Sequence, residues 1–221
     1  MTVLPNFLGR ASCTIDRTFR LTFTIPFAYG VARQSALICY NSFMETVNGK
    51  GSEKELYEPI RGHLMAAFGD ESHICHLEVT ADGVFSHTLK SFVRHDIIFS
   101  FLGKKASPDL TGFIAKKGPD VVIGSMSSIQ DFITVEIKRE RITLQDIYQA
   151  KMYGDLFGAK YALLISPERI PEEIKRLDQC VFVTYRYMSG WYLYVGEWYA
   201  PECMMEPFRW LPHSPLKDLG Y

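Results

Sequence analysis

The sequence predicts an α/β fold, a mixed sheet flanked by helices, with additional β-strands at both ends of the chain. Short apolar runs typical of strands alternate with longer amphipathic segments typical of helices. The chain has 221 residues, of which 47% are hydrophobic and 22% are charged, as in ordinary folded proteins. This length is sufficient for one large domain, or for a core domain with smaller additions.

Breaks in composition divide the chain into three parts. Residues 1–50 are expected to form a β-rich N-terminal extension, which ends at the Gly-rich break 48–52. Residues 51–178 are expected to form the core. Residues 179–221 are expected to supply C-terminal β-strands and a tail packed on that core.

The first half of the core begins with a helix. Ser52 is a suitable N-cap for a helix that continues to Phe68, with Leu56, Ile60 and Leu64 on one apolar face. After it, the sequence predicts strands over 74–79 and 97–102, separated by a short helix over 85–93. These assignments depend on the period of the apolar residues.

The second half of the core contains a hairpin followed by alternating helices and strands. The last hairpin strand is 132–138, and Thr143 with Asp146 forms a weak capping box for a helix that Gly158 ends. A buried strand is expected over 161–165, and Pro171 is expected to begin another helix. The segment 180–199 is predicted to be a strand pair around Ser189-Gly190.

The end of the strand 132–138 has the most informative pattern in the chain. Because strand side chains alternate between faces, Glu136 and Lys138 are expected on one side and Ile137 on the other. Charged side chains are rare in such an apolar strand unless they are paired or bind a metal ion. The pattern therefore indicates a functional site.

A second carboxylate is expected from one of two Pro-Asp pairs that precede this strand. The first position of a hairpin lies near the last, so an Asp at the start of the preceding strand would adjoin Glu136. Asp120 would give the more compact hairpin, whereas Asp109 precedes the better strand sequence, 110–115. Both remain candidates.

Two carboxylates and the Ile137 carbonyl would suit Mg²⁺ or Mn²⁺, since these hard cations prefer oxygen ligands. Such an ion lowers the pKa of bound water and neutralises charge on a phosphate. Lys138 could orient or deprotonate that water, or stabilise the developing charge. Basic residues nearby are candidates for contact with a nucleic-acid backbone: Lys104, Lys105, Lys116, Lys117, Arg139, Arg141 and Lys151.

The helix that follows the strand 132–138 contains Gln149-Ala150-Lys151-Met152-Tyr153. Together with Pro-Asp and Glu136-Ile137-Lys138, this pattern resembles the PD-(D/E)xK nuclease superfamily over about residues 51–166. The resemblance implies a restriction-endonuclease-like core, hydrolysis of DNA phosphodiester bonds, and a role in DNA repair or defence. It implies that Glu53 is an acidic residue near the metal ion, with Glu55 and Glu58 as alternatives. It also implies that Gln149 and Tyr153 support the active site, and it makes a homodimer plausible.

Other features limit the alternatives. The formal net charge of −1 disfavours a protein that coats nucleic acid nonspecifically. Five cysteines without a C-x-x-C pair disfavour a zinc knuckle or a disulfide framework. No signal peptide or membrane-spanning run is apparent, so a cytoplasmic protein with no membrane partner is expected. Two alternatives stay open: a catalytically inactive module that binds nucleic acid or serves as an interaction or dimerisation scaffold, and a nuclease that acts on RNA.

Overall fold

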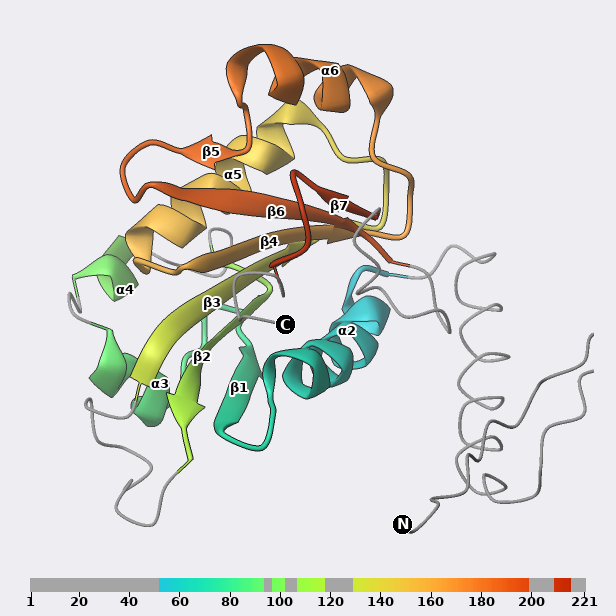
Figure 1. Cartoon of the computed structure of the whole chain (residues 1–221). Coiled ribbons are helices and arrows are strands. Elements are labelled where there is room, and N and C mark those ends of the chain that lie inside the picture. Colours follow the sequence, from blue (N-terminus) through green and yellow to red (C-terminus); the bar gives the residue numbers. More distant parts are fainter. Residues whose placement is uncertain (1–51, 94–96, 102–106, 118–128, 199–208, 216–221) are drawn as a thin grey trace, which may run out of the picture.

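The computed structural model describes residues 52–93, 97–101, 107–117, 129–198 and 209–215. The expected N-terminal extension, 1–50, lies outside this range. Figure 1 shows a mixed sheet flanked by helices, as predicted. The strands are β1 (His73–Val79), β2 (Leu110–Lys116), β3 (Ile129–Ile137), β4 (Tyr161–Ser166), β5 (Tyr185–Arg186), β6 (Trp191–Glu197) and β7 (Trp210–Leu211). The helices are α2 (Lys54–Phe68), α3 (His87–Phe92), α4 (Ile98–Phe101), α5 (Leu144–Leu156) and α6 (Glu172–Val181).

The seven described strands form one sheet in the order β1-β2-β3-β4-β6-β5, and β7 pairs with β6. The first three strands are antiparallel neighbours, whereas β3, β4 and β6 run parallel. A parallel pair needs a long crossover, and α5 supplies the one between β3 and β4. Because β6 lies beside β4, the C-terminal strands are part of the same sheet as the expected core.

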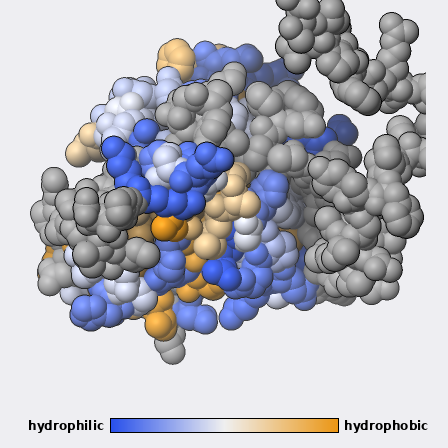
Figure 2. Space-filling model, turned by 60° about the horizontal axis from the view of Figure 1, so that its bottom comes forward, coloured by the Kyte–Doolittle hydropathy of each residue, from blue (hydrophilic) through white to orange (hydrophobic). Residues whose placement is uncertain are grey.

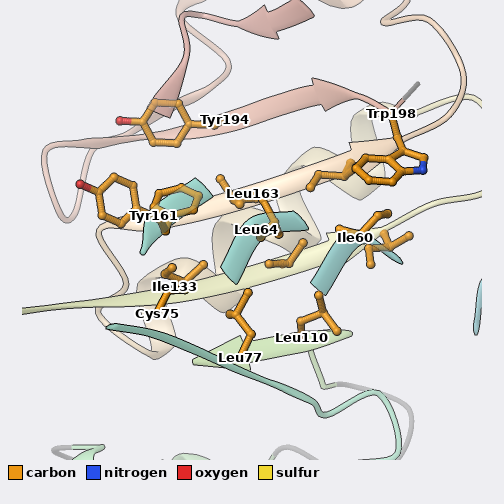
Figure 3. Packing of buried hydrophobic residues seen from close by; sticks show 14 of the residues in the cluster. Ile60, Leu64, Cys75, Leu77, Leu110, Ile133, Tyr161, Leu163, Tyr194 and Trp198 are labelled. Carbon is orange, nitrogen blue, oxygen red and sulfur yellow. The ribbon is translucent and has the colours of Figure 1, made fainter. Parts of the chain in front are cut away.

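Helix α2 covers one face of the sheet. The apolar face predicted from the sequence is buried, with Leu56, Ile60 and Leu64 at most 1% exposed. Figure 3 shows Ile60 and Leu64 packed among side chains that come from several strands. This apolar contact fixes where the start of α2 lies relative to the ends of β2 and β3.

The opposite face is covered by α3, α4, α5 and α6, which contribute to two further apolar clusters. Helix α5 begins at the predicted capping box, in which the Thr143 and Asp146 side chains accept from each other's backbone N–H. Gly158 follows the end of α5 with φ of +58°, a conformation that favours glycine. Local sequence signals therefore set both ends of this helix.

Three predicted assignments need correction. The run 97–102 was expected to be a strand, but residues 98–101 form the short helix α4, and Ile98 packs in the cluster with α3 and α5. An apolar run this short does not distinguish the two structures by its period. Ser52 is not the N-cap of α2, because that position belongs to Glu53, which makes no side-chain cap bond. The strand pair after residue 180 begins only at Tyr185, since α6 continues through Val181.

The surface of the described part of the chain is mostly polar in the view of Figure 2. Hydrophobic residues appear there as small areas between hydrophilic ones. Within the described residues, no helix combines the length and the apolar character that crossing a bilayer requires.

Candidate active site

The register of the β2–β3 hairpin brings Asp109 beside Glu136. Leu110 is paired with Val135, so the residue before Leu110 lies next to the residue after Val135. The Ile137 backbone N–H donates to Asp109 Oδ2 at 2.7 Å. Of the two Asp residues left open by the sequence, Asp109 therefore adjoins Glu136, whereas Asp120 lies outside the described residues.

Glu136 projects from β3 toward α5 and is only 3% exposed. Its Oε1 accepts from Gln149 Nε2 at 2.9 Å and lies 2.9 Å from Lys138 Nζ. Its Oε2 is buried and has no hydrogen-bond partner. On the other side of the strand, Ile137 is fully buried in the cluster beneath α2, which matches the predicted alternation.

The site holds two buried carboxylates close to one ammonium group. Burial raises the pKa of Glu136 to about 8, and the neighbouring charge of Asp109 adds to this effect, while Lys138 opposes it. Burial also raises the pKa of Asp109, although the hydrogen bonds from Tyr57 and Ile137 oppose the shift. The Asp109–Glu136 pair therefore retains a proton more readily than two solvated carboxylates would.

Lys138 is held in its charged form. Burial alone would lower the pKa of Lys138, but the hydrogen bond and charge of Glu136, with the charges of Glu53 and Asp109, raise it above its usual value. Lys138 Nζ also lies 3.9 Å from Asp146 Oδ1, at the start of α5. A lysine held in this way suits charge stabilisation better than proton abstraction.

Helix α5 brings Gln149 and Tyr153 to the same site, as their spacing predicts. Gln149 Nε2 lies 3.2 Å from Tyr153 Oη in addition to its bond to Glu136. Burial raises the pKa of Tyr153, so its hydroxyl stays protonated near neutral pH. The Gln-x-x-x-Tyr pair thus holds one oxygen of Glu136 from the α5 side.

Helix α2 brings Glu53 and a residue that the sequence did not indicate, Tyr57. The charge of Glu53 acts on Asp109, Glu136 and Lys138, which places Glu53 near the site. Tyr57 donates from its hydroxyl to Asp109 Oδ1 at 2.6 Å. The one sequence signal for Tyr57 was its spacing of four from Glu53, which puts both on one side of α2.

The donor chemistry of the site fits a hard divalent cation. Asp109 and Glu136 supply carboxylate oxygens, and Glu136 Oε2 has no other partner. Among the described residues, no group of three or more His, Cys, Asp or Glu side chains is placed to hold a metal ion. The ligands from the protein would therefore be these two carboxylates and the Ile137 carbonyl, with water completing the shell.

Several of the predicted basic residues have other partners. Lys151 donates to the backbone carbonyls of Val183 and Tyr185, which ties α5 to the segment after α6. Arg139 lies 3.6 Å from Glu55, and Arg141 pairs with Glu173 at 2.8 Å on the surface. Arg139 and Arg141 follow the site directly in sequence, so these two stay beside it.

Lys116 and Lys117 lie at the opposite end of β2 from Asp109. Lys116 is six positions along β2 from Leu110, a distance of about 20 Å at the usual rise per residue. Lys117 Nζ donates to the Asp70 carbonyl at 2.6 Å. The predicted basic rim therefore does not include these two lysines, while Lys104 and Lys105 lie outside the described residues.

Comparison of the chain with protein-family models, with curated proteins and with solved structures finds no match. The geometry of the site and the motifs themselves are therefore the basis for assigning a function.

Proposed function

We propose that this protein is a nuclease that uses Mg²⁺ or Mn²⁺ to hydrolyse phosphodiester bonds in DNA. The observation that carries the proposal is a pair of buried carboxyl groups beside a single ammonium group at the end of β3. Asp109 and Glu136 are 7% and 3% exposed, and Lys138 is the neighbouring cation. Burying a second carboxylate beside the first costs stability, and a bound cation would remove that cost.

The resemblance to the PD-(D/E)xK superfamily supports the same proposal from the sequence. Its motif positions are separated by up to 40 residues along the chain, yet Asp109, Glu136, Lys138 and Gln149 lie at one site. A restriction-endonuclease-like core is compatible with the mixed sheet described above and forms part of the proposal. The homodimer expected from the resemblance stays a prediction.

Each residue has a role that follows from its contacts. Asp109 and Glu136 would hold the metal ion, which supplies an acidified water and neutralises charge on the phosphate when it is bound. Lys138 would stabilise the negative charge that develops on the phosphate oxygens, since its ammonium is held in the charged form. Gln149 keeps Glu136 in place, and Arg139 and Arg141 are the basic residues nearest to the site in sequence.

The proposal is tested by cleavage of labelled single-stranded, duplex and branched DNA, and of RNA, with Mg²⁺ or Mn²⁺. The wild type should cut at least one DNA substrate, and Glu136→Ala and Lys138→Ala should abolish cutting without loss of folded structure. Lys160→Ala is a matched control, because Lys160 is also ion-paired beside β3 but pairs with Asp131 near the start of that strand.

Each other outcome has a definite meaning. Cleavage of RNA alone would keep the metal-dependent mechanism and change the substrate. If the folded wild type neither cuts any substrate nor binds Mn²⁺ by calorimetry, the nuclease proposal fails, and a catalytically inactive module that binds nucleic acid or acts as a scaffold becomes the better description.

A further inference from the structure

Tyr57 makes a buried contact that joins α2 to the candidate active site. Its side chain lies at the end of the first turn of α2 and is 7% exposed. Its hydroxyl donates to Asp109 Oδ1 at 2.6 Å, across 52 residues of sequence. A bond of this length to a carboxylate is among the stronger hydrogen bonds in proteins.

The other oxygen of Asp109 is held separately. Asp109 Oδ2 accepts from the Ile137 backbone N–H at 2.7 Å, so each oxygen has its own donor. Because a carboxylate oxygen has two acceptor sites, one remains on each oxygen for a cation. Asp109 precedes the first residue of β2, so pairing within the strand does not by itself fix its side chain. The Tyr57 hydroxyl is the one side-chain donor to Asp109 that the described residues supply.

The rest of α2 keeps Tyr57 in place without depending on this bond. Leu56, Ile60 and Leu64 are buried against the sheet, and Glu55 lies 3.6 Å from Arg139 at the end of β3. Removal of the hydroxyl alone would therefore leave the helix docked and release one oxygen of Asp109.

We infer that Tyr57 is a positioning residue that orients Asp109 for a divalent cation, an inference that rests on the proposed function. Tyr57 donates a hydrogen bond to Asp109 from α2, and Gln149 donates one to Glu136 from α5. Each of the two carboxylates is then oriented by a different helix, one on each face of the sheet. Partners of this kind typically change metal affinity by about 10- to 100-fold when they are removed.

The test compares Tyr57→Phe with the wild type by calorimetric titration with Mn²⁺ and by DNA cleavage. Tyr57→Phe keeps the buried ring and removes the donor, so Mn²⁺ should bind about tenfold or more weakly. The Michaelis constant for DNA at saturating Mn²⁺ should stay unchanged, because the Tyr57 side chain is buried and its hydroxyl is bonded to Asp109. Tyr194→Phe is the matched control, since Tyr194 lies in the same apolar cluster and should leave Mn²⁺ affinity unchanged.

A second pair of substitutions keeps the test valid if Tyr57→Phe does not fold. 4-Fluorophenylalanine at position 57 has nearly the size of tyrosine but no hydrogen to donate, whereas 4-aminophenylalanine keeps a donor. The fluoro side chain should weaken Mn²⁺ binding, and the amino side chain should largely restore it. A role in packing alone would predict equal affinity for the two.

The inference and the proposed function fail in different ways. If the wild type binds Mn²⁺ and cuts DNA, and Tyr57→Phe binds Mn²⁺ with wild-type affinity, the role of Tyr57 is wrong and the nuclease stands. A folded wild type that binds no Mn²⁺ would overturn both.

Discussion

Arg186 and Glu136 are both buried charged residues beside α5, and the structure holds them in different ways. The Arg186 side chain is fully buried, with Nε 2.9 Å from Asp155 Oδ1 and Nη1 donating to the Ala159 carbonyl. Glu136 has one cation, Lys138, and a second carboxylate, Asp109, close to it. Arg186 is therefore balanced by one opposite charge, whereas the Glu136 site has two acidic groups for one cation and carries an excess negative charge once Glu136 loses its proton.

The presence of a buried atom without a hydrogen-bond partner does not distinguish Arg186 from Glu136. Arg186 Nη2 and Glu136 Oε2 are both buried without a hydrogen-bond partner. The balance of charge does distinguish them, because an uncompensated buried charge is far more costly than an unmade hydrogen bond. A balanced pair is expected to support the fold, and an unbalanced group is expected to support function.

Glu136→Gln should have the largest effect, because it should abolish activity while stabilising the protein. Cleavage should fall by about 10³-fold, since a metal ligand is lost. In metal-free solution at pH 8, the free energy of unfolding should rise by about 1 to 3 kcal/mol, because the repulsion from Asp109 is removed. Cleavage assays and urea unfolding measure the two effects. A destabilised Glu136→Gln protein would show that Glu136 serves the fold.

Arg186→Met should have the reverse effect. The methionine fills much of the same space but leaves Asp155 and the Ala159 carbonyl without their partner, so the free energy of unfolding should fall by about 3 kcal/mol. Asp155 is 32% exposed, which places the loss at the lower end of the usual range. Cleavage by the folded fraction should be retained, and Arg169→Met is the control, because the Arg169 side chain is exposed. An Arg186→Met protein that is as stable as the wild type but does not cut DNA would contradict the structural role of Arg186.

The stability of the metal-free protein should depend on pH in a direction that the Glu136 pKa determines. Its pKa is raised from 4.5 to about 8 on folding, so between these values the folded protein binds more protons than the unfolded chain. The free energy of unfolding should therefore fall as the pH rises from about 4.5 to 8. Urea unfolding with chelator across this range, with and without added Mg²⁺, tests this. The Glu136→Gln variant should show a weaker dependence.

Gln149→Leu should have a moderate effect on activity. It removes the donor to Glu136 Oε1 and frees that carboxylate to move, so kcat/KM should fall by about tenfold. Gln145→Leu is the matched control, because Gln145 lies on the same helix with its side chain exposed. Equal rates for the two variants would remove Gln149 from the site.

Lys116→Ala and Lys117→Ala should have the smallest effects on cleavage. Both lysines lie at the end of β2 that is remote from Asp109, so DNA cleavage should stay within about twofold of wild type. Arg139→Ala, beside the site, provides the comparison. A large loss in either lysine variant would mean that the substrate extends along the whole strand.

Much of the fold was predictable because its signals are local. The capping box at Thr143, the buried run 161–165 and the apolar face of α2 each depend on a few neighbouring residues, and the structure contains the predicted element in each case. The helix α4 was not predictable in this way, because residues 98–101 give an apolar run too short to show a period. The packing of Ile98 against α3 and α5 decides its conformation.

The local part of the candidate site follows from short patterns in the sequence. Alternation along β3 places Glu136 and Lys138 together, and a spacing of four places Gln149 and Tyr153 on one side of α5. The choice of Asp109 as the neighbour of Glu136, and the bond from Tyr57 to Asp109, come from the packing of distant segments. These contacts depend on the register of a hairpin and on the docking of a helix 52 residues away, and both are set by burial of apolar surface across the whole sheet.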